Sequence, residues 1–343
     1  MRHELVINGL DNAWIREFGC DCSRCKRQSR AANTSISLLS FEGSSLVHHL
    51  LFDVGAGVRE SLSRIEALQL QPRLDQIVLS HWHSDHTCEL VPLCKTWARS
   101  QSRNGITPKN ISVWARAGSA AWLERLYPQL EKAGLELQAS NEFEPLGTLL
   151  EPISLGLPDV MLTPVTLAHH SADLHPDGSE NPWPCCSGFV LEIQALKTPS
   201  LKIVFLWDTD VGNTWLEHPN PAQRAAFEKL RHADHIFFDC NTWAYTHTQD
   251  GRPASHVSFG MVQRFAAALE PKRSWLMHIS GHEDLGDGFG WDDATWQREA
   301  QRAWREHALP GDVRVPSIGE VIRLDTRSNS STSELDAQES ARV

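Results

Sequence analysis

Short apolar runs alternate with amphipathic stretches along most of the chain, a pattern typical of strands joined by helices. Residues 3–10 and 34–41 run apolar or alternate between apolar and polar positions, and Leu50-Leu51-Phe52-Asp53-Val54-Gly55 reads as a further strand. Apolar residues between 58 and 68 then recur at helical spacing, which predicts a helix that ends near residue 70.

The rest of the chain continues this alternation. The pattern predicts strands at 77–79, 111–114, 189–193, 202–207, 236–239, 274–277 and 320–324, and short strands broken by Gly and Pro between 134 and 167. It predicts helices from just after residue 86 to about 100 and at 118–133, 221–232, 257–269 and 292–307. Because strands cluster before and after helices in both halves, we expect an α/β fold, an αββα sandwich of two mixed sheets packed face to face with helices outside.

A single domain over residues 1–326 fits this pattern best, since neither an internal repeat nor a linker divides the chain. Its N-terminal part carries a cysteine knot at 20–25. Residues 327–343 are rich in Ser, Glu and Asp with almost no apolar content, which predicts a disordered tail.

Composition narrows the class of protein. The chain has 343 residues, 41% of them hydrophobic, and a net charge of −11 without a basic run that could grip a phosphate backbone. We therefore expect a small-molecule substrate and no nucleic acid polymer. No signal peptide is evident and no stretch is apolar enough for a membrane span, so we expect a cytoplasmic protein without membrane contact. A homodimer stays open.

One hexapeptide concentrates metal-binding chemistry, His81-Trp82-His83-Ser84-Asp85-His86, and it follows the apolar run 77–79. If the chain stays extended past that strand, the period of two directs His81 and His83 to the same side. A helix that begins just after the motif would place Asp85 and His86 at its start, aimed at a second point nearby. The spacing thus favours two adjacent metals, and the alternative is a surface loop that happens to be rich in His.

Three of the eight cysteines lie within six residues: Cys20, Cys22 and Cys25. This spacing is too tight for an ordinary disulfide framework, and three thiolates can supply most of a tetrahedral zinc site. The alternative is a group of reduced cysteines without a metal. Cys185 and Cys186 are expected to be buried thiols.

Further metal-competent residues stand just past predicted strands: Asp53, His170, Asp208 and His278. A lone His or Asp in such a place is commonly a turn or cap residue. Their coincidence with the hexapeptide in one chain predicts that strand ends converge on a common site.

In this order, the motifs resemble those of the metallo-β-lactamase fold superfamily over about residues 3–325. The matching positions are Asp53, His81-x-His83-x-Asp85-His86, His170, Asp208 and His278. Further segments resemble the branch that contains the phosphonate-pathway cyclic phosphodiesterase and protein B of pyrroloquinoline quinone biosynthesis. These segments are Phe18-Gly19-Cys20-x-Cys22-x-x-Cys25, Leu206-Trp207-Asp208-Thr209, Phe238-Asp239-Cys240 and His278-Ile279-Ser280.

The resemblance implies two catalytic divalent metals. His81, His83 and His170 would hold one metal, Asp85, His86 and His278 the other, and Asp208 would bridge them. Asp53 would brace the hexapeptide by hydrogen bonding without binding metal. His169 competes with His170, which the resemblance favours because the family's His stands directly before Ser.

Two further assignments follow from the same resemblance. His256 stands where the phosphodiesterase has a His that assists the leaving group. Cys20, Cys22 and Cys25, together with His282, would form a structural zinc site. His282 follows His278 by four residues where the phosphodiesterase has three, so this chain departs from the family's spacing there.

These residues imply a dinuclear metal-dependent hydrolase of a small ester, in which a metal-bound hydroxide attacks the electrophile. A phosphodiester is favoured as substrate, with cyclic phosphodiesters included. Asp85 and His256 are the candidate catalytic residues, and zinc is the favoured metal, with manganese or iron as alternatives. The other readings are a lactone or acyl-ester hydrolase, an iron-dependent oxidoreductase of a cofactor or natural-product pathway, and a non-catalytic binding protein.

Overall fold

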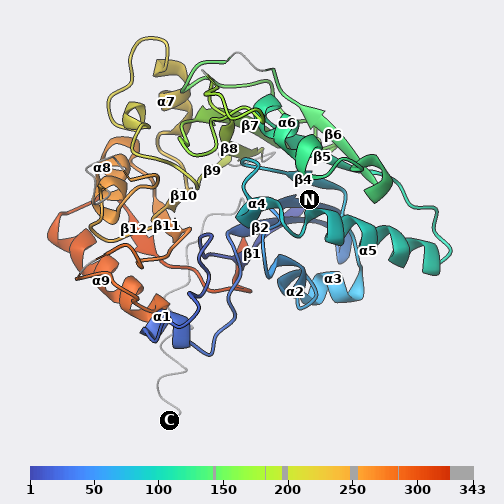
Figure 1. The fold of residues 1–343 in the computed structure, drawn as a ribbon, viewed down its shortest axis with the longest axis horizontal. Helices are drawn as coiled ribbons and strands as arrows, with labels where there is room; N and C mark the ends of the chain where they lie inside the picture. The colour runs from blue at the N-terminus through green and yellow to red at the C-terminus, as the bar shows by residue number, and fades with distance from the viewer. Residues whose placement is uncertain (142–143, 182, 195–199, 248–253, 285, 325–343) are drawn as a thin grey trace.

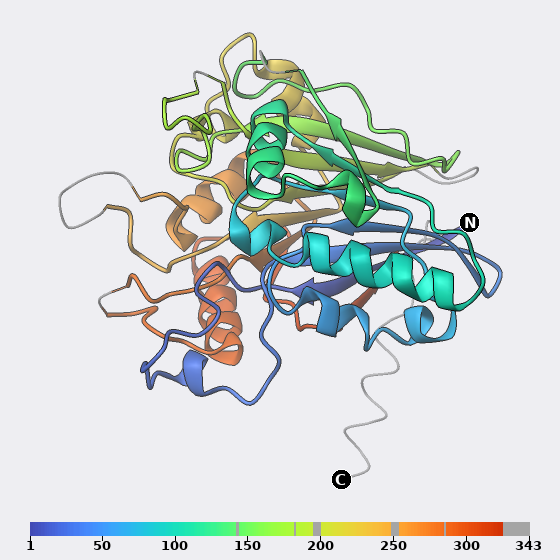
Figure 2. The same cartoon turned by 45° about the vertical axis from the view of Figure 1, so that its right-hand side comes forward.

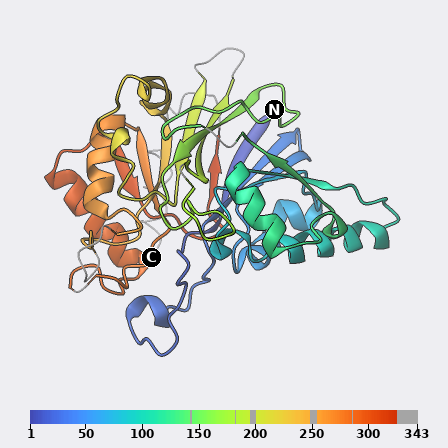
Figure 3. The same cartoon turned by 45° about the horizontal axis from the view of Figure 1, so that its top comes forward.

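The structure is a computed structural model that describes residues 1–324 except 142–143, 182, 195–199, 248–253 and 285. Its strands form two mixed sheets that pack face to face, with helices on the outer faces (Figures 1 and 3). The fold predicted from the sequence is therefore confirmed. The assignment of residues 1–326 to one domain stays a prediction, and the end of that domain and the predicted tail at 327–343 lie outside the described residues.

The first sheet has seven strands in the order β13-β1-β2-β3-β4-β5-β6. Their bounds are β1 (Arg2–Gly9), β2 (Ser35–Glu42), β3 (Ser45–Phe52), β4 (Gln76–Val78), β5 (Ile111–Ala115), β6 (Leu135–Ala139) and β13 (Val321–Arg323). Strands β13, β1, β2 and β3 pair antiparallel, whereas β3 to β6 pair parallel.

The second sheet has six strands in the order β12-β11-β10-β9-β8-β7, and it too has an antiparallel part and a parallel part. Its strands are β7 (Val160–Leu167), β8 (Cys186–Ile193), β9 (Leu201–Leu206), β10 (His235–Asp239), β11 (Arg273–Met277) and β12 (Asp312–Arg314). Strands β7 to β9 pair antiparallel and β9 to β12 parallel. Because parallel neighbours end at the same edge of a sheet, residues that follow β9, β10 and β11 are delivered to one edge.

The helices cover the two outer faces. Against the first sheet lie α2 (Val58–Leu62), α3 (Glu66–Leu70), α5 (Leu90–Arg103) and α6 (Ala117–Leu126), and against the second α7 (Arg224–Leu230), α8 (Phe259–Leu269) and α9 (Asp293–Glu306) (Figure 1). Shorter turns are α1 (Ser23–Lys26), α4 (Ser84–Thr87), η1 (Glu131–Ala133) and η2 (Thr214–Leu216). Among the helices that the structure describes, none combines the length and apolar character needed to cross a lipid bilayer.

The strands feed two cores in alternation. In β3, Leu50 and Phe52 belong to the core between the sheets, whereas Leu51 packs in the core beneath the helices of the first sheet. Phe52 meets Phe205 of the second sheet with ring centroids 4.6 Å apart. This contact ties the two sheets together close to the ends of β3 and β9.

The structure departs from the predicted elements in a few places. The predicted helix up to residue 70 is split into α2 and α3, because the Ser63 hydroxyl bonds the Glu60 carbonyl and Ile65 adopts an extended backbone conformation. The predicted helix at 118–133 ends at Leu126, just before Pro128, since proline disfavours helical geometry in the residue before it. Strand β12 was not predicted. Its own sequence does not indicate a strand, and it forms one by pairing with β11.

Candidate metal centre

The hexapeptide lies at the end of β4. Leu79 extends the strand by donating its backbone N–H to the Trp114 carbonyl over 2.9 Å, and the chain then turns into α4. The helix therefore begins at Ser84, inside the motif and not just after it. His81 and His83 precede α4, while Asp85 and His86 lie in its first turns, so the two pairs point at neighbouring positions as predicted.

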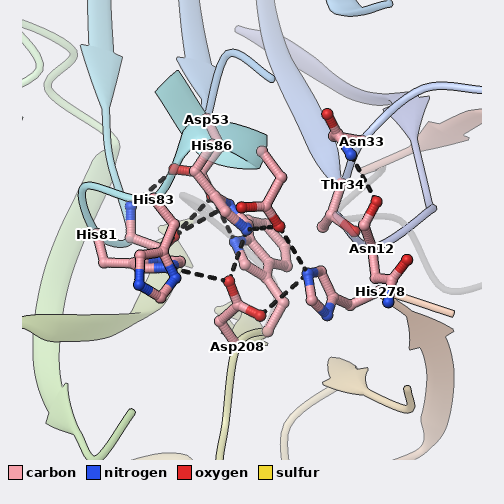
Figure 4. A network of polar contacts seen from close by, with 12 residues as sticks. Asn12, Asn33, Thr34, Asp53, His81, His83, His86, Asp208 and His278 are labelled. Carbon is pink, nitrogen blue, oxygen red and sulfur yellow. Dashed lines mark hydrogen bonds and ion pairs between the residues drawn. The ribbon is translucent and has the colours of Figure 1, made fainter. Parts of the chain in front are cut away.

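Seven side chains converge there in two groups, with the candidate ligand atoms of each group within 4.8 Å of one another. Figure 4 labels His81, His83, His86, Asp208 and His278 among them. One group is His81, His83 and His169, and the other is Asp85, His86, Asp208 and His278. Asp208 also lies between the groups, because its Oδ2 is 3.2 Å from His81 Nε2 and 2.6 Å from His86 Nε2. Its Oδ1 is 3.0 Å from Nε2 of His278.

The structure corrects the preference for His170. His169 is fully buried, and its Nε2 lies 3.3 Å from Nδ1 of His83, whereas His170 is exposed and donates its backbone N–H to Asp210. The reason is a turn directly after β7, in which the backbone N–H groups of Ala172 and Asp173 bond the His169 carbonyl. This turn changes which side chain points inward, so sequence proximity to Ser does not identify the ligand.

Asp53 and two of the converging residues have left-handed backbone conformations at strand ends. Asp53 after β3, Asp208 just past β9 and His278 after β11 have φ values of 54°, 55° and 56°. Residues other than glycine rarely adopt this region, and those that do cluster at functional sites. Here the reversal of the backbone turns each side chain off its strand axis into the space between the sheets.

Asp53 braces the hexapeptide, as the resemblance implied. Its fully buried carboxylate accepts hydrogen bonds from the Ser80 N–H (2.7 Å), the Ser80 hydroxyl (2.8 Å), Nδ1 of His86 (2.8 Å) and Nε1 of Trp207 (2.7 Å). Gly55 permits the close approach of this strand end to α4, since a Cβ there would lie 1.7 Å from the Asp85 carbonyl oxygen. Any side chain at Gly55 would displace the turn that carries Asp85.

Protein acceptors occupy the outer nitrogens of two of the histidines, His83 and His86. His86 Nδ1 donates to Asp53, and its Nε2 faces Oδ2 of Asp208 at 2.6 Å. His83 Nε2 lies 3.2 Å from the Ser171 carbonyl, so that nitrogen carries the proton and Nδ1 faces the centre. Partners of this kind fix the tautomer and ring orientation of metal-binding histidines.

Four inner atoms of the cluster lack hydrogen-bond partners among the described residues. These atoms are Nε2 of His81, Nε2 of His86 and both carboxylate oxygens of Asp208. All of them are buried, and they approach one another closely. Buried polar atoms are almost always paired, and lone pairs that face one another repel. A bound cation resolves both problems, so these residues fit a metal site.

The pKa values differ between the two groups. Burial, followed by the neighbouring His83, holds the pKa of His81 well below its usual value, and burial likewise lowers that of His169. Burial also opposes the charged forms of His86 and His278, but the carboxylates, Asp208 foremost, outweigh it and raise both pKa values well above the usual range. The first group is therefore an assembly of neutral imidazoles, as metal binding requires.

His256 stands beside the second group. Its Nδ1 donates to Oδ2 of Asp239 over 3.0 Å and lies 3.4 Å from Oδ1 of Asp208, while 20% of its side chain stays exposed. Sequence reasoning did not single out Asp239 as a functional residue. A signal was present, because Asp239 ends β10 just as Asp53 and Asp208 follow their strands, and it forms a group with Asp208, His256 and His278.

The cysteine cluster lies apart from this centre. Cys20, Cys22, Cys25 and His282 place their ligand atoms within 4.8 Å of one another, and His282 Nε2 is 3.4 Å from Cys22 Sγ and 3.3 Å from Cys25 Sγ. The Ser280 hydroxyl lies 3.1 Å from His282 Nδ1 and so orients the ring. The altered spacing after His278 is thus accommodated, and three sulfurs and one imidazole match the donor set of a structural zinc site.

Buried ion pairs hold α1, the short helix next to this cluster, in place. Arg24, fully buried between Cys22 and Cys25 in α1, pairs with Asp11 and Asp293. Cys185 and Cys186, by contrast, are buried away from this cluster, as expected.

Comparisons with known proteins agree with this geometry. The sequence matches the family described as "Beta-lactamase superfamily domain" over residues 48–279. No curated protein matches the chain. A solved diphosphatase from the PhnP family is similar, with a TM-score of 0.60, 20% identity and coverage of 94% of this chain and 98% of that chain.

Two further structures share the fold. The metallo-β-lactamase fold protein YhfI from Bacillus subtilis has a TM-score of 0.58 and 17% identity, covering 94% of this chain and 100% of that chain. CmlA, a diiron β-hydroxylase from Streptomyces venezuelae, has a TM-score of 0.51 and 15% identity, covering 89% of this chain and 58% of that chain. Together with the family match, this fold and site define the class: the chain belongs to the metallo-β-lactamase fold superfamily.

Replacing Asp53 with Asn should weaken metal binding at the Asp85, His86 and His278 group. The amide removes an acceptor from His86, and loss of such partners typically lowers metal affinity about 10- to 100-fold. Titration of metal-free protein with zinc measures the change. Asp75→Asn is a matched control, because Asp75 also accepts a backbone N–H at a strand end but lies outside the cluster. Equal affinity in Asp53→Asn and the wild type would contradict a bracing role.

Replacing Cys22 with Ser should remove one zinc equivalent and lower Tm by roughly 5 °C, since a ligand of a stabilising metal is lost. Metal bound at the histidine and aspartate centre should stay. Metal analysis and thermal unfolding measure both effects, and Cys88→Ser, at an exposed cysteine, is the control. Unchanged zinc content together with an unchanged Tm would rule out a structural metal at the cysteine cluster.

Proposed function

We propose that the protein is a dinuclear metal-dependent hydrolase of a small phosphodiester, with cyclic phosphodiesters among its substrates. The observation that carries this proposal is the convergence of seven ligand groups, six of them buried and His83 half-buried. Nε2 of His81 and His86 and both oxygens of Asp208 lack hydrogen-bond partners among the described residues, while outer atoms of His83 and His86 are held by protein acceptors. Membership of a superfamily made up mostly of metal-dependent hydrolases supports it.

Each metal would have its own set of ligands. His81, His83 and His169 would hold one, Asp85, His86 and His278 the other, and Asp208 lies where a bridging carboxylate would stand. Two divalent ions in such a site supply an activated water near neutral pH and polarise the ester oxygen. The imidazole-rich donor set favours zinc, with manganese or iron as alternatives.

His256 is the proposed donor of a proton to the leaving oxygen. Burial opposes its charged form, but the charge of Asp239 and the hydrogen bond to it outweigh burial and raise the pKa of His256. The raised pKa favours the protonated ring, which Asp239 holds at Nδ1 so that the other nitrogen can donate a proton. This pairing gives Asp239 a positioning role in the proposed reaction.

The net charge of the chain and its fold support the proposed substrate class and partners. A net charge of −11 disfavours a nucleic acid polymer, so we propose a small molecule as the partner of the site and leave a homodimer open. A fold neighbour named as a diphosphatase of the PhnP family supports phosphate-ester chemistry and the proposed branch. Location in the cytoplasm, where the thiols would stay reduced, is also part of the proposal.

The decisive experiment strips the protein with a chelator and reconstitutes it separately with zinc, manganese and iron. Each form is assayed on bis(p-nitrophenyl) phosphate, 2′,3′-cyclic nucleotides and simple lactones. We expect phosphodiester hydrolysis that requires about two metal equivalents per chain at the centre. Hydrolysis of lactones alone would replace the proposal by acyl-ester chemistry. Dioxygen uptake by the iron form without hydrolysis would place this chain with iron oxidoreductases.

Replacing His256 with Ala should slow turnover of alkyl phosphodiesters by about 10²- to 10⁴-fold, because their leaving oxygen needs a proton. Esters with a p-nitrophenolate leaving group should be much less affected, and metal content should stay intact. Rates on the two substrate types and metal analysis test this. His247→Ala, at an exposed loop histidine, is the control. Equal losses on both substrate types, or loss of metal, would contradict the role of an acid.

A further inference from the structure

Trp82, the residue between the first two histidines of the hexapeptide, packs its side chain against helix α6. Its indole stacks on Trp122 of α6 with ring centroids 4.1 Å apart and an interplanar angle of 10°. The edge of the same indole also contacts the ring of His83, with centroids 4.6 Å apart and an interplanar angle of 75°. Trp82 therefore links a candidate metal ligand to helix α6.

Both indoles donate to the segment that follows β7. Nε1 of Trp82 bonds the Ala172 carbonyl over 2.9 Å, and Nε1 of Trp122 bonds the Leu174 carbonyl over 2.6 Å. Helix α6 thus lies beside this segment, which is 5–7 residues past the last residue of β7 (Figure 2). Two stacked rings hold alternate carbonyls of one short stretch, and we call Trp82 and Trp122 the tryptophan clamp.

The two bonded carbonyls belong to the segment 169–174, and this clamped segment supplies two features of the three-histidine group. It begins at His169, whose carbonyl accepts the backbone N–H of Ala172, so fixing Ala172 also fixes the start of the turn that points His169 inward. It also includes Ser171, whose carbonyl lies 3.2 Å from Nε2 of His83 and so sets the tautomer of that ring. One ligand and the orientation of another depend on where this segment lies.

We infer that Trp82 and Trp122 are positioning residues that set the metal affinity of the His81, His83 and His169 group. Neither indole contacts the opposite group of Asp85, His86 and His278 through any hydrogen bond or ring stacking described for the residues of the structure. The effect of the clamp is therefore selective for one of the two metals. This inference rests on the proposed two-metal centre.

The test replaces Trp122 with Phe, which keeps an aromatic ring against Trp82 and removes the N–H donor to Leu174. Metal-free protein is titrated with cobalt, whose visible absorption reports on its ligands, and with zinc by calorimetry. Of the two equivalents that bind at this centre, apart from the one at the cysteine cluster, we expect one to bind about 10- to 100-fold more weakly, as for loss of other groups that orient ligands, and the other to be unchanged. Trp82→Phe should have the same selective effect.

Trp304→Phe is the matched control, because Trp304 also donates its indole N–H to a backbone carbonyl, that of Pro310, outside the metal centre. We expect this variant to lower Tm as the clamp variants do but to keep both metal affinities. Clamp variants that lose Tm as Trp304→Phe does, while binding both equivalents like the wild type, would overturn the inference and leave the proposed function standing. A wild-type protein that binds no metal at the three histidines would overturn both.

Discussion

The buried carboxylate of Asp53 is the interaction on which the site depends. It accepts four hydrogen bonds, two from Ser80, one from His86 and one from Trp207, and these donors come from both sheets. A buried charge is costly unless it is fully hydrogen-bonded, and removal of one partner of such a group costs about 3–5 kcal/mol. The cluster of hydrogen bonds therefore sets the distance between the end of β4 and the end of β9, and with it the distance between the hexapeptide and Asp208.

The same logic governs the rest of the centre. Each sheet has parallel strands that end at one edge, and left-handed residues there turn side chains toward the opposite sheet. The strain of Asp53, Asp208 and His278 is offset by the contacts that surround them. Contacts further out, such as Asp239 on His256 and the tryptophan clamp on the 169–174 segment, orient groups that by themselves could rotate. The candidate metal ligands and the residues that orient them are thus connected through hydrogen bonds.

Much of this was predictable from the sequence, for a physical reason. The hexapeptide, Asp208 and His278 follow directly from apolar runs, so the position of a strand fixes the position of the residue after it. The three cysteines are close in sequence and need no knowledge of the fold to be grouped. The two sheets and their order of strands and helices were visible for the same reason, since the alternation of apolar and polar positions is a local property.

What could not be predicted depends on contacts between distant segments. His169 is selected over His170 by a turn that the local pattern does not reveal, and strand β12 exists because β11 lies beside it. Trp82 and Trp122 are far apart in sequence, so neither suggests the other. The cysteine cluster carries a related consequence for synthesis, because 257 residues separate Cys25 from His282. At ordinary translation rates the three thiols wait roughly 10 to 50 seconds for their fourth partner, exposed to whatever oxidant or stray ion the nascent chain meets.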